Sequence, residues 1–161
     1  MNPVSIYTDV ISCEESSAEL YLDLSVRFFD QIDLSWFWVE MAMEEKQQAG
    51  LLLYCLENQI FAHNLPDAAQ MKHLRGLLYD LRTRTLHPSL SVDDAFDVAI
   101  QIESSELYTI SRKLVEPINA PTYVVQKKLA LCGGTHLFKL RSAADRFPTS
   151  PAVRTRLASP I

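Results

Sequence analysis

Apolar residues recur along most of this chain at intervals of three to four positions, which is the period of an α-helix. No stretch alternates apolar and polar residues for long enough to predict a β-sheet. The pattern therefore predicts an all-α fold. It divides the chain into four long helices, with a shorter helix between the second and the third.

The first two predicted helices form an antiparallel hairpin. The first helix begins between residues 9 and 12 and runs to about residue 32, and the second spans about residues 34–62. Residues 33–35 leave room only for a tight connection, so the second helix must fold back on the first.

A long crossover follows the hairpin. Pro66 opens it, a helix is predicted over residues 67–85, and the pair His87-Pro88 closes it. A connection of this length predicts that the third helix starts at the same end of the bundle as the first.

The second half of the chain predicts another hairpin and a tail. The third helix starts at a cap within residues 91–94 and runs to about residue 115, and the fourth spans about residues 122–145. Residues 147–161 are rich in Pro, Ser and Thr, and we expect them to be poorly ordered. Residues 1–146 thus form one helical domain.

Polar residues interrupt the apolar stripes of all four helices. A carboxylate in such a stripe is costly unless it gains a proton, a cation or a full set of hydrogen bonds. In the first helix the stripe runs through Ile11, Ala18, Leu22, Val26 and Phe29. Across the four helices, the polar residues predicted to face the interior are Glu15, Glu45, Gln48, Glu103 and His136. Glu15 has an alternative explanation as part of a capping box with Ser12.

A repeat links the two halves of the chain. The sequence Glu-Ser-Ser at residues 15–17 recurs at residues 103–105, an offset of 88. The same offset lays Glu45 on Gly133 and Gln48 on His136. The inward polar positions are therefore predicted to meet at one level of the bundle.

Parts of the first three predicted helices resemble the helix patterns of the ferritin-like superfamily, and the chain is most similar to its rubrerythrin-like branch. The resembling segments are residues 14–21, 37–52 and 99–107. The resemblance covers roughly residues 10–140. It implies an antiparallel four-helix bundle whose two hairpins are joined by a long crossover. In that family the first and third helices each supply a Glu, the second and fourth each supply a Glu-x-x-His pair, and these side chains hold two irons.

The resemblance makes Glu15, Glu45, Gln48, Glu103 and His136 candidate metal ligands. Gln48 and Gly133 stand where the family has a His and a Glu, so the di-iron site is degenerate. Glu45, Glu103 and His136 remain as a ligand set that suits a single iron, manganese or zinc ion. Glu14, Glu19 and Glu106 are alternatives to the glutamates of this set.

Three functions stay open. One is a rubrerythrin-like protein with an eroded, mononuclear metal site, which would be an iron- or manganese-dependent oxidoreductase if it is active. Another is a metal-free bundle that acts through assembly or a protein partner. The third is a true peroxidase or ferroxidase of the rubrerythrin kind, which the two missing ligands and the lack of a pair of CxxC motifs disfavour. Trp36, Trp38 and Leu53 lie outside the inner stripe of the second helix, which predicts a homodimer.

Charge and composition argue against two other classes of partner, nucleic acid and the membrane. The net charge is −5 and the basic residues are dispersed, which argues against nucleic acid. No apolar run is long enough to predict a membrane span. The three cysteines, Cys13, Cys55 and Cys132, form no CxxC pair, which favours reduced thiols and a cytoplasmic location.

Overall fold

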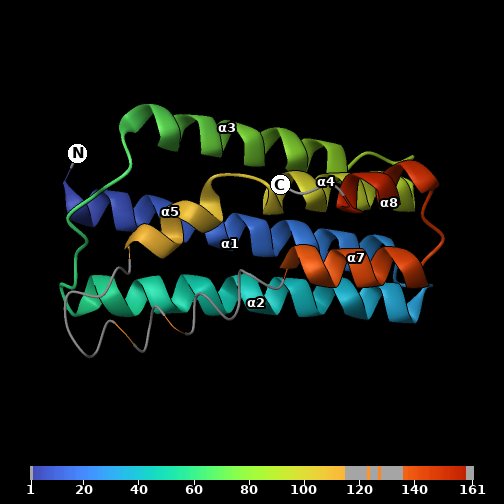
Figure 1. Ribbon diagram of the computed structural model, residues 1–161, viewed down its shortest axis with the longest axis horizontal. Helices are drawn as coiled ribbons and strands as arrows, with labels where there is room; N and C mark the ends of the chain where they lie inside the picture. The colour runs from blue at the N-terminus through green and yellow to red at the C-terminus, as the bar shows by residue number, and fades with distance from the viewer. Residues whose placement is uncertain (1, 115–122, 124–126, 128–135, 159–161) are drawn as a thin grey trace.

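The computed structural model describes residues 2–114, 123, 127 and 136–158 (Figure 1). Within these residues the secondary structure consists of seven helices, and it includes no strand. The prediction of an all-α fold is confirmed. None of the helices in these ranges is both long and apolar enough to cross a membrane.

Two long helices, α1 (Pro3–Arg27) and α2 (Ile32–Glu57), lie side by side as an antiparallel hairpin (Figure 1). The start of α1 is earlier than predicted. The side chain of Asn2 accepts a hydrogen bond of 3.0 Å from the backbone N–H of Val4, and Pro3 occupies the first turn. An Asn cap followed by Pro is a strong helix start, so the predicted start at residues 9–12 is wrong.

The buried face of α1 is also rotated from the predicted one. Leu22, Val26 and Phe29 were expected to face inward, but they are 40%, 71% and 68% exposed. The buried face runs instead through Glu14 and Tyr21. Because α1 carries apolar residues on two faces and each step along a helix turns by about 100°, an error of one position selects the wrong face.

Helix α3 (Ala68–Thr85) lies along α1 (Figure 1). Arg75 binds Asp9 at 2.8 Å, and further along both helices Arg82 binds Glu19 at 2.8 Å. The two helices therefore run in the same direction. A helix of this length spans about 27 Å, so α3 carries the chain from one end of the hairpin to the other.

The third predicted helix is two helices, α4 (Val92–Glu103) and α5 (Leu107–Leu114). They run antiparallel to α1, because Glu103 contacts Tyr21 while Leu114 accepts a hydrogen bond from the hydroxyl of Tyr7. The prediction that the third helix starts at the same end as the first is therefore wrong. The physical reason is that the crossover is helical over most of its length and does not turn back.

The break between α4 and α5 directly follows Glu103. Serine favours helix ends because its side chain bonds to nearby backbone groups. Here Ser104 ends α4, and the hydroxyl of Ser105 accepts a hydrogen bond of 3.3 Å from the backbone N–H of Leu107. The break leaves the Glu103 carboxylate at a helix end rather than within a continuous helix.

Helix α7 (His136–Arg146) runs antiparallel to α2. Lys139 contacts Glu44, and beyond the end of α7 the ring of Phe147 lies 6.1 Å from that of Phe37. Residues 122, 124–126 and 128–135 of the predicted fourth helix, which include Gly133, lie outside the described residues.

Helix α8 (Pro151–Ala158) corrects the prediction of a disordered tail. Its Val153 and Leu157 are 1% and 4% exposed, so this segment adds to the core. The high content of Pro and Ser misled the prediction, because Pro151 starts the helix instead of interrupting it.

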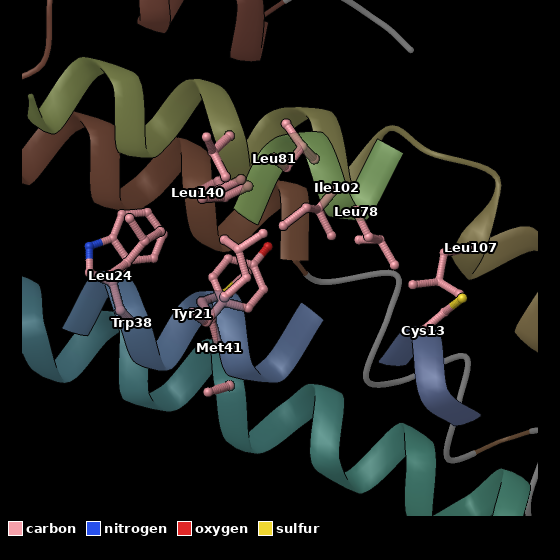
Figure 2. Close-up of a cluster of buried hydrophobic side chains, with 14 of the residues drawn as sticks. Cys13, Tyr21, Leu24, Trp38, Met41, Leu78, Leu81, Ile102, Leu107 and Leu140 are labelled. Atoms are coloured by element: carbon pink, nitrogen blue, oxygen red, sulfur yellow. The ribbon is translucent and has the colours of Figure 1, made fainter. Parts of the chain in front are cut away.

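All seven described helices contribute to one hydrophobic core, part of which Figure 2 shows. Its side chains include Cys13, Tyr21, Leu24, Trp38, Met41, Leu78, Leu81, Ile102, Leu107 and Leu140 (Figure 2). Trp38, expected at the surface, is fully buried and stacks on Tyr21 with ring centroids 5.9 Å apart. The Tyr21 side chain thereby extends from the aromatic core to Glu103.

Candidate metal centre

Three helices bring Glu45, Glu103 and His136 together. Glu45 lies in the middle of α2, Glu103 is the last residue of α4, and His136 is the first residue of α7. One ligand atom from each of these side chains lies within 4.8 Å of the other two. The His136 Nδ1 atom is 2.9 Å from Glu103 Oε2 and 3.1 Å from Glu45 Oε1.

The cluster is almost completely shielded from solvent. The side chains of His136, Glu45 and Glu103 are 1%, 4% and 6% exposed. Among the described residues, Glu14, Gln48, Ile102, Leu107 and Tyr108 also line a small cavity at this cluster. Measured as the volume that the centre of a water molecule can occupy, the cavity has about 10 Å³. That is room for one ion or one water molecule and too little for an organic substrate.

Glu14 supplies another buried carboxyl group, from α1. Its side chain accepts a hydrogen bond from the hydroxyl of Ser111 and is in hydrogen-bond contact with Glu45. Burial raises the pKa of Glu14 well above its ordinary value, and the negative charge of Glu45 raises it further. The neutral, protonated form of Glu14 is therefore favoured in the folded protein.

The predicted position of Glu15 is wrong, because this residue is exposed and Glu14 takes its place inside. The rotation of α1 described above accounts for the exchange. Glu19 and Glu106 are exposed as well, and Glu19 pairs with Arg82. Gln48 is 2% exposed and lines the cavity, as its place in the α2 stripe predicted.

Tyr21 is a member of the site that the sequence analysis missed. Its hydroxyl donates a hydrogen bond of 2.6 Å to Glu103 Oε1. Burial raises the pKa of Glu103, and the bonds from His136 and Tyr21 oppose that rise. The spacing of seven residues from Glu14 would have placed Tyr21 on the same face of α1, two turns further on.

Glu44 was also missed, and it faces the other nitrogen of the His136 ring. The Nε2 atom of His136 lies 2.8 Å from Glu44 Oε2, and the ammonium of Lys139 contacts Glu44 Oε1. Burial alone would raise the pKa of Glu44, but His136 and Lys139 outweigh it and hold that pKa below its ordinary value.

His136 is positively charged in this arrangement. Burial by itself would lower the pKa of the imidazole, but the carboxylates of Glu103, Glu44 and Glu45 raise it to about 12. Both ring nitrogens then carry protons, one directed at Glu103 and Glu45 and the other toward Glu44.

The carboxyl groups around the ring outnumber the cationic side chains. Among the described residues, Glu44, Glu45 and Glu103 lie around two cationic side chains, His136 and Lys139. A divalent ion in place of the Nδ1 proton would leave a neutral imidazole and add positive charge beside these carboxyl groups. Buried charges that are balanced in this way are far less costly than unpaired ones.

Comparison with known proteins finds no match to a family model, a curated protein or a solved structure.

Proposed function

We propose that this chain binds one divalent transition-metal ion through Glu45, Glu103 and His136. The observation that carries the proposal is the convergence of two carboxylates and an imidazole within 4.8 Å in a buried site. Ligand atoms about 2.1 Å from a tetrahedral ion lie roughly 3.4 Å from one another. The distances of 2.9 and 3.1 Å at His136 Nδ1 therefore need only small side-chain rotations.

The donor set narrows the class of ion. Two carboxylate oxygens and one imidazole nitrogen suit Fe(II), Mn(II) or Zn(II), and they disfavour Cu(I), which prefers sulfur ligands. When bound, iron or manganese would supply redox chemistry, and zinc would supply a Lewis acid. Three protein ligands leave a coordination position open, and the cavity beside them has room for about one water molecule.

We further propose that the fold is a degenerate ferritin-like bundle. The site is surrounded by α1, α2, α7 and the pair α4 and α5, which together take the place of the third helix of a four-helix bundle. The long crossover contains α3. Glu14 on α1 and Glu103 on α4 flank Glu45, as the acids of that superfamily flank a metal centre. Gln48 provides an amide where that family has an imidazole. The loss of this ligand supports a site for one ion rather than two.

A metal-free role in assembly is the second candidate, and two observations favour it. The charged His136 and the proton on Glu14 already offset most of the buried negative charge. In addition, Val26, Phe29, Ile32 and Trp36, which we name the turn patch, are 63–78% exposed around the α1–α2 turn. Such a patch suits a homodimer.

Elemental analysis of protein purified without a histidine tag tests the two candidates. We expect about one ion per chain in the wild type and none in His136→Ala. His73→Ala is the matched control, because His73 is exposed on α3 and should retain the ion. Equal metal content in the wild type and His136→Ala would contradict the ligand assignment. No metal in any of the three proteins would favour the assembly role.

A further inference from the structure

We infer that Glu44, held by Lys139, is a positioning residue that orients the His136 ring so that Nδ1, rather than Nε2, binds the ion. This inference rests on the proposed metal site and names residues that lie outside its ligand set. Neither Glu44 nor Lys139 touches the cavity.

The two nitrogens of the His136 ring face different carboxylates. Nδ1 points to the ligand pair Glu45 and Glu103, at 3.1 and 2.9 Å, whereas Nε2 lies 2.8 Å from Glu44. A metal-bound histidine uses one nitrogen for the ion and commonly donates the other N–H to a carboxylate, which fixes the ring and raises its basicity. Glu44 occupies the place of that carboxylate.

Glu44 is itself held in place from α7. Lys139 lies three positions after His136, so both side chains project from the same face of that helix. Its ammonium contacts Glu44 Oε1, which leaves Oε2 for the ring. The Glu44 side chain is 24% exposed, against 1% for His136, so it connects the buried ring to the partly exposed lysine. Helix α7 therefore supplies both the ligand and the group that anchors its orienting partner.

Without an ion, the Nε2–H of the His136 ring does not point at Glu44, and an ion bound at Nδ1 would let the ring turn toward it. Although His136 Nε2 and Glu44 Oε2 are close, neither atom has an aligned hydrogen bond among the described residues. The ring is held at the opposite nitrogen by two carboxylates at once. An ion at Nδ1 would replace both of those contacts by one bond, so the ring could turn until its Nε2–H points at Glu44.

The test uses Zn²⁺ as the probe and nitrogen NMR of the histidine ring as the readout. Glu44→Ala removes the orienting carboxylate, and Lys139→Met removes its anchor. Glu40→Ala is the matched control, because Glu40 lies one turn earlier on α2 and is exposed. Glu44→Gln is the rescue variant, since its amide oxygen still accepts a hydrogen bond from Nε2–H.

We expect Glu44→Ala to weaken Zn²⁺ binding by about 10- to 100-fold and to divide ligation between Nδ1 and Nε2. Lys139→Met should shift both readouts in the same direction by less. Glu44→Gln should restore ligation through Nδ1, and Glu40→Ala should match the wild type. The inference would be overturned if Glu44→Ala bound Zn²⁺ as tightly as the wild type and still bound it through Nδ1 alone. So would an equal loss of affinity in Glu40→Ala, which would indicate a general effect of charge.

The metal-free protein separates this inference from the proposed function. If the wild type takes up no Zn²⁺, the proposed metal site fails. The orientation of the ring is then tested in the same spectra without metal. Glu44→Ala should alter the Nε2–H signal of His136 and leave the Nδ1–H signal in place. An unchanged Nε2–H signal would overturn the orienting role of Glu44 as well.

Discussion

Glu14 of α1 and Glu45 of α2 meet in the interior of the hairpin with their carboxyl groups in hydrogen-bond contact. Two carboxyl groups can share a hydrogen bond only if one of them carries a proton. Burial and the neighbouring Glu45 raise the pKa of Glu14 more than the hydroxyl donated by Ser111 lowers it, so the shared proton is favoured on Glu14. The metal-free site therefore stores protons, and this property can be tested by substitution and by pH.

Glu14→Gln should leave the stability of the metal-free protein within about 1 kcal/mol of the wild type at pH 7. The glutamine can accept the hydrogen bond from Ser111 and donate its amide to Glu45, as the protonated carboxyl does. Urea unfolding measures the effect, and Glu15→Gln, at an exposed position, is the control. A loss of more than about 3 kcal/mol in Glu14→Gln alone would mean that Glu14 is ionised and paired in the fold.

The stability of the metal-free protein should fall as pH rises from 6.5 to 9. The pKa of His136 is raised from 6.5 to about 12, so in this window the folded state binds a proton that the unfolded state has released. The stabilisation is complete below pH 6.5 and decreases by up to about 1.4 kcal/mol per pH unit. The raised pKa of Glu14 acts with the same sign from its ordinary value upward.

Thermal unfolding in the presence of a chelator measures this dependence. In His136→Gln the slope between pH 6.5 and 9 should become shallower, because one of the titrating groups is gone. The lowered pKa of Glu44 acts only in acid, where stability is lost as pH falls, so it does not oppose the trend in this window. A wild-type stability that increases from pH 6.5 to 9 would contradict the charged state of His136.

Metal affinity should show the opposite pH dependence. An ion at His136 Nδ1 must displace a proton, so its apparent affinity should rise by about tenfold per pH unit between pH 6 and 8. Competition titrations with a chromophoric chelator for Zn²⁺ or Mn²⁺ measure this slope. An affinity that does not depend on pH would show that the ion avoids the imidazole.

Tyr21→Phe should destabilise the protein by about 1–3 kcal/mol. The substitution keeps the ring stacked on Trp38 but removes the hydroxyl that donates to Glu103 at 2.6 Å, which leaves a buried carboxylate short of one donor. Tyr54→Phe, at a position that is 44% exposed, is the control and should have little effect. Equal stability of the two variants in urea would show that the Tyr21 hydroxyl is not needed by Glu103.

If the turn patch forms a homodimer, light scattering should return twice the chain mass of 18.3 kDa. Phe29→Ser with Trp36→Ser should return the mass of one chain, because both side chains are more than 60% exposed and their loss leaves the core intact. Phe138→Ser, at a residue of α7 that is 71% exposed, is the control. A wild type with the mass of one chain at micromolar concentration would contradict the dimer.

The sequence by itself determined the helical class, the hairpin and the inward positions of Glu45, Gln48, Glu103 and His136, but not the buried glutamate of α1. Apolar spacing is a local property, so it placed Glu45 and Gln48 on the inner stripe of α2. It also indicated a helix for the crossover, and the structure shows that a capping box of Asp67 and Gln70 starts this helix. The stripes and the repeat predicted that Glu45, Glu103 and His136 meet in the interior, and their selection as ligands came from the family resemblance.

Only the tertiary structure decided which face of α1 is buried. Glu14 and Glu15 fit neighbouring apolar stripes about equally well, and the choice depends on how α2, α3 and α5 pack around the helix. The same packing decided the direction of α4 and α5 and the roles of Tyr21 and Glu44. Their contacts join residues 82 and 92 positions apart in the chain, and such pairs are set by packing between helices rather than by a local period.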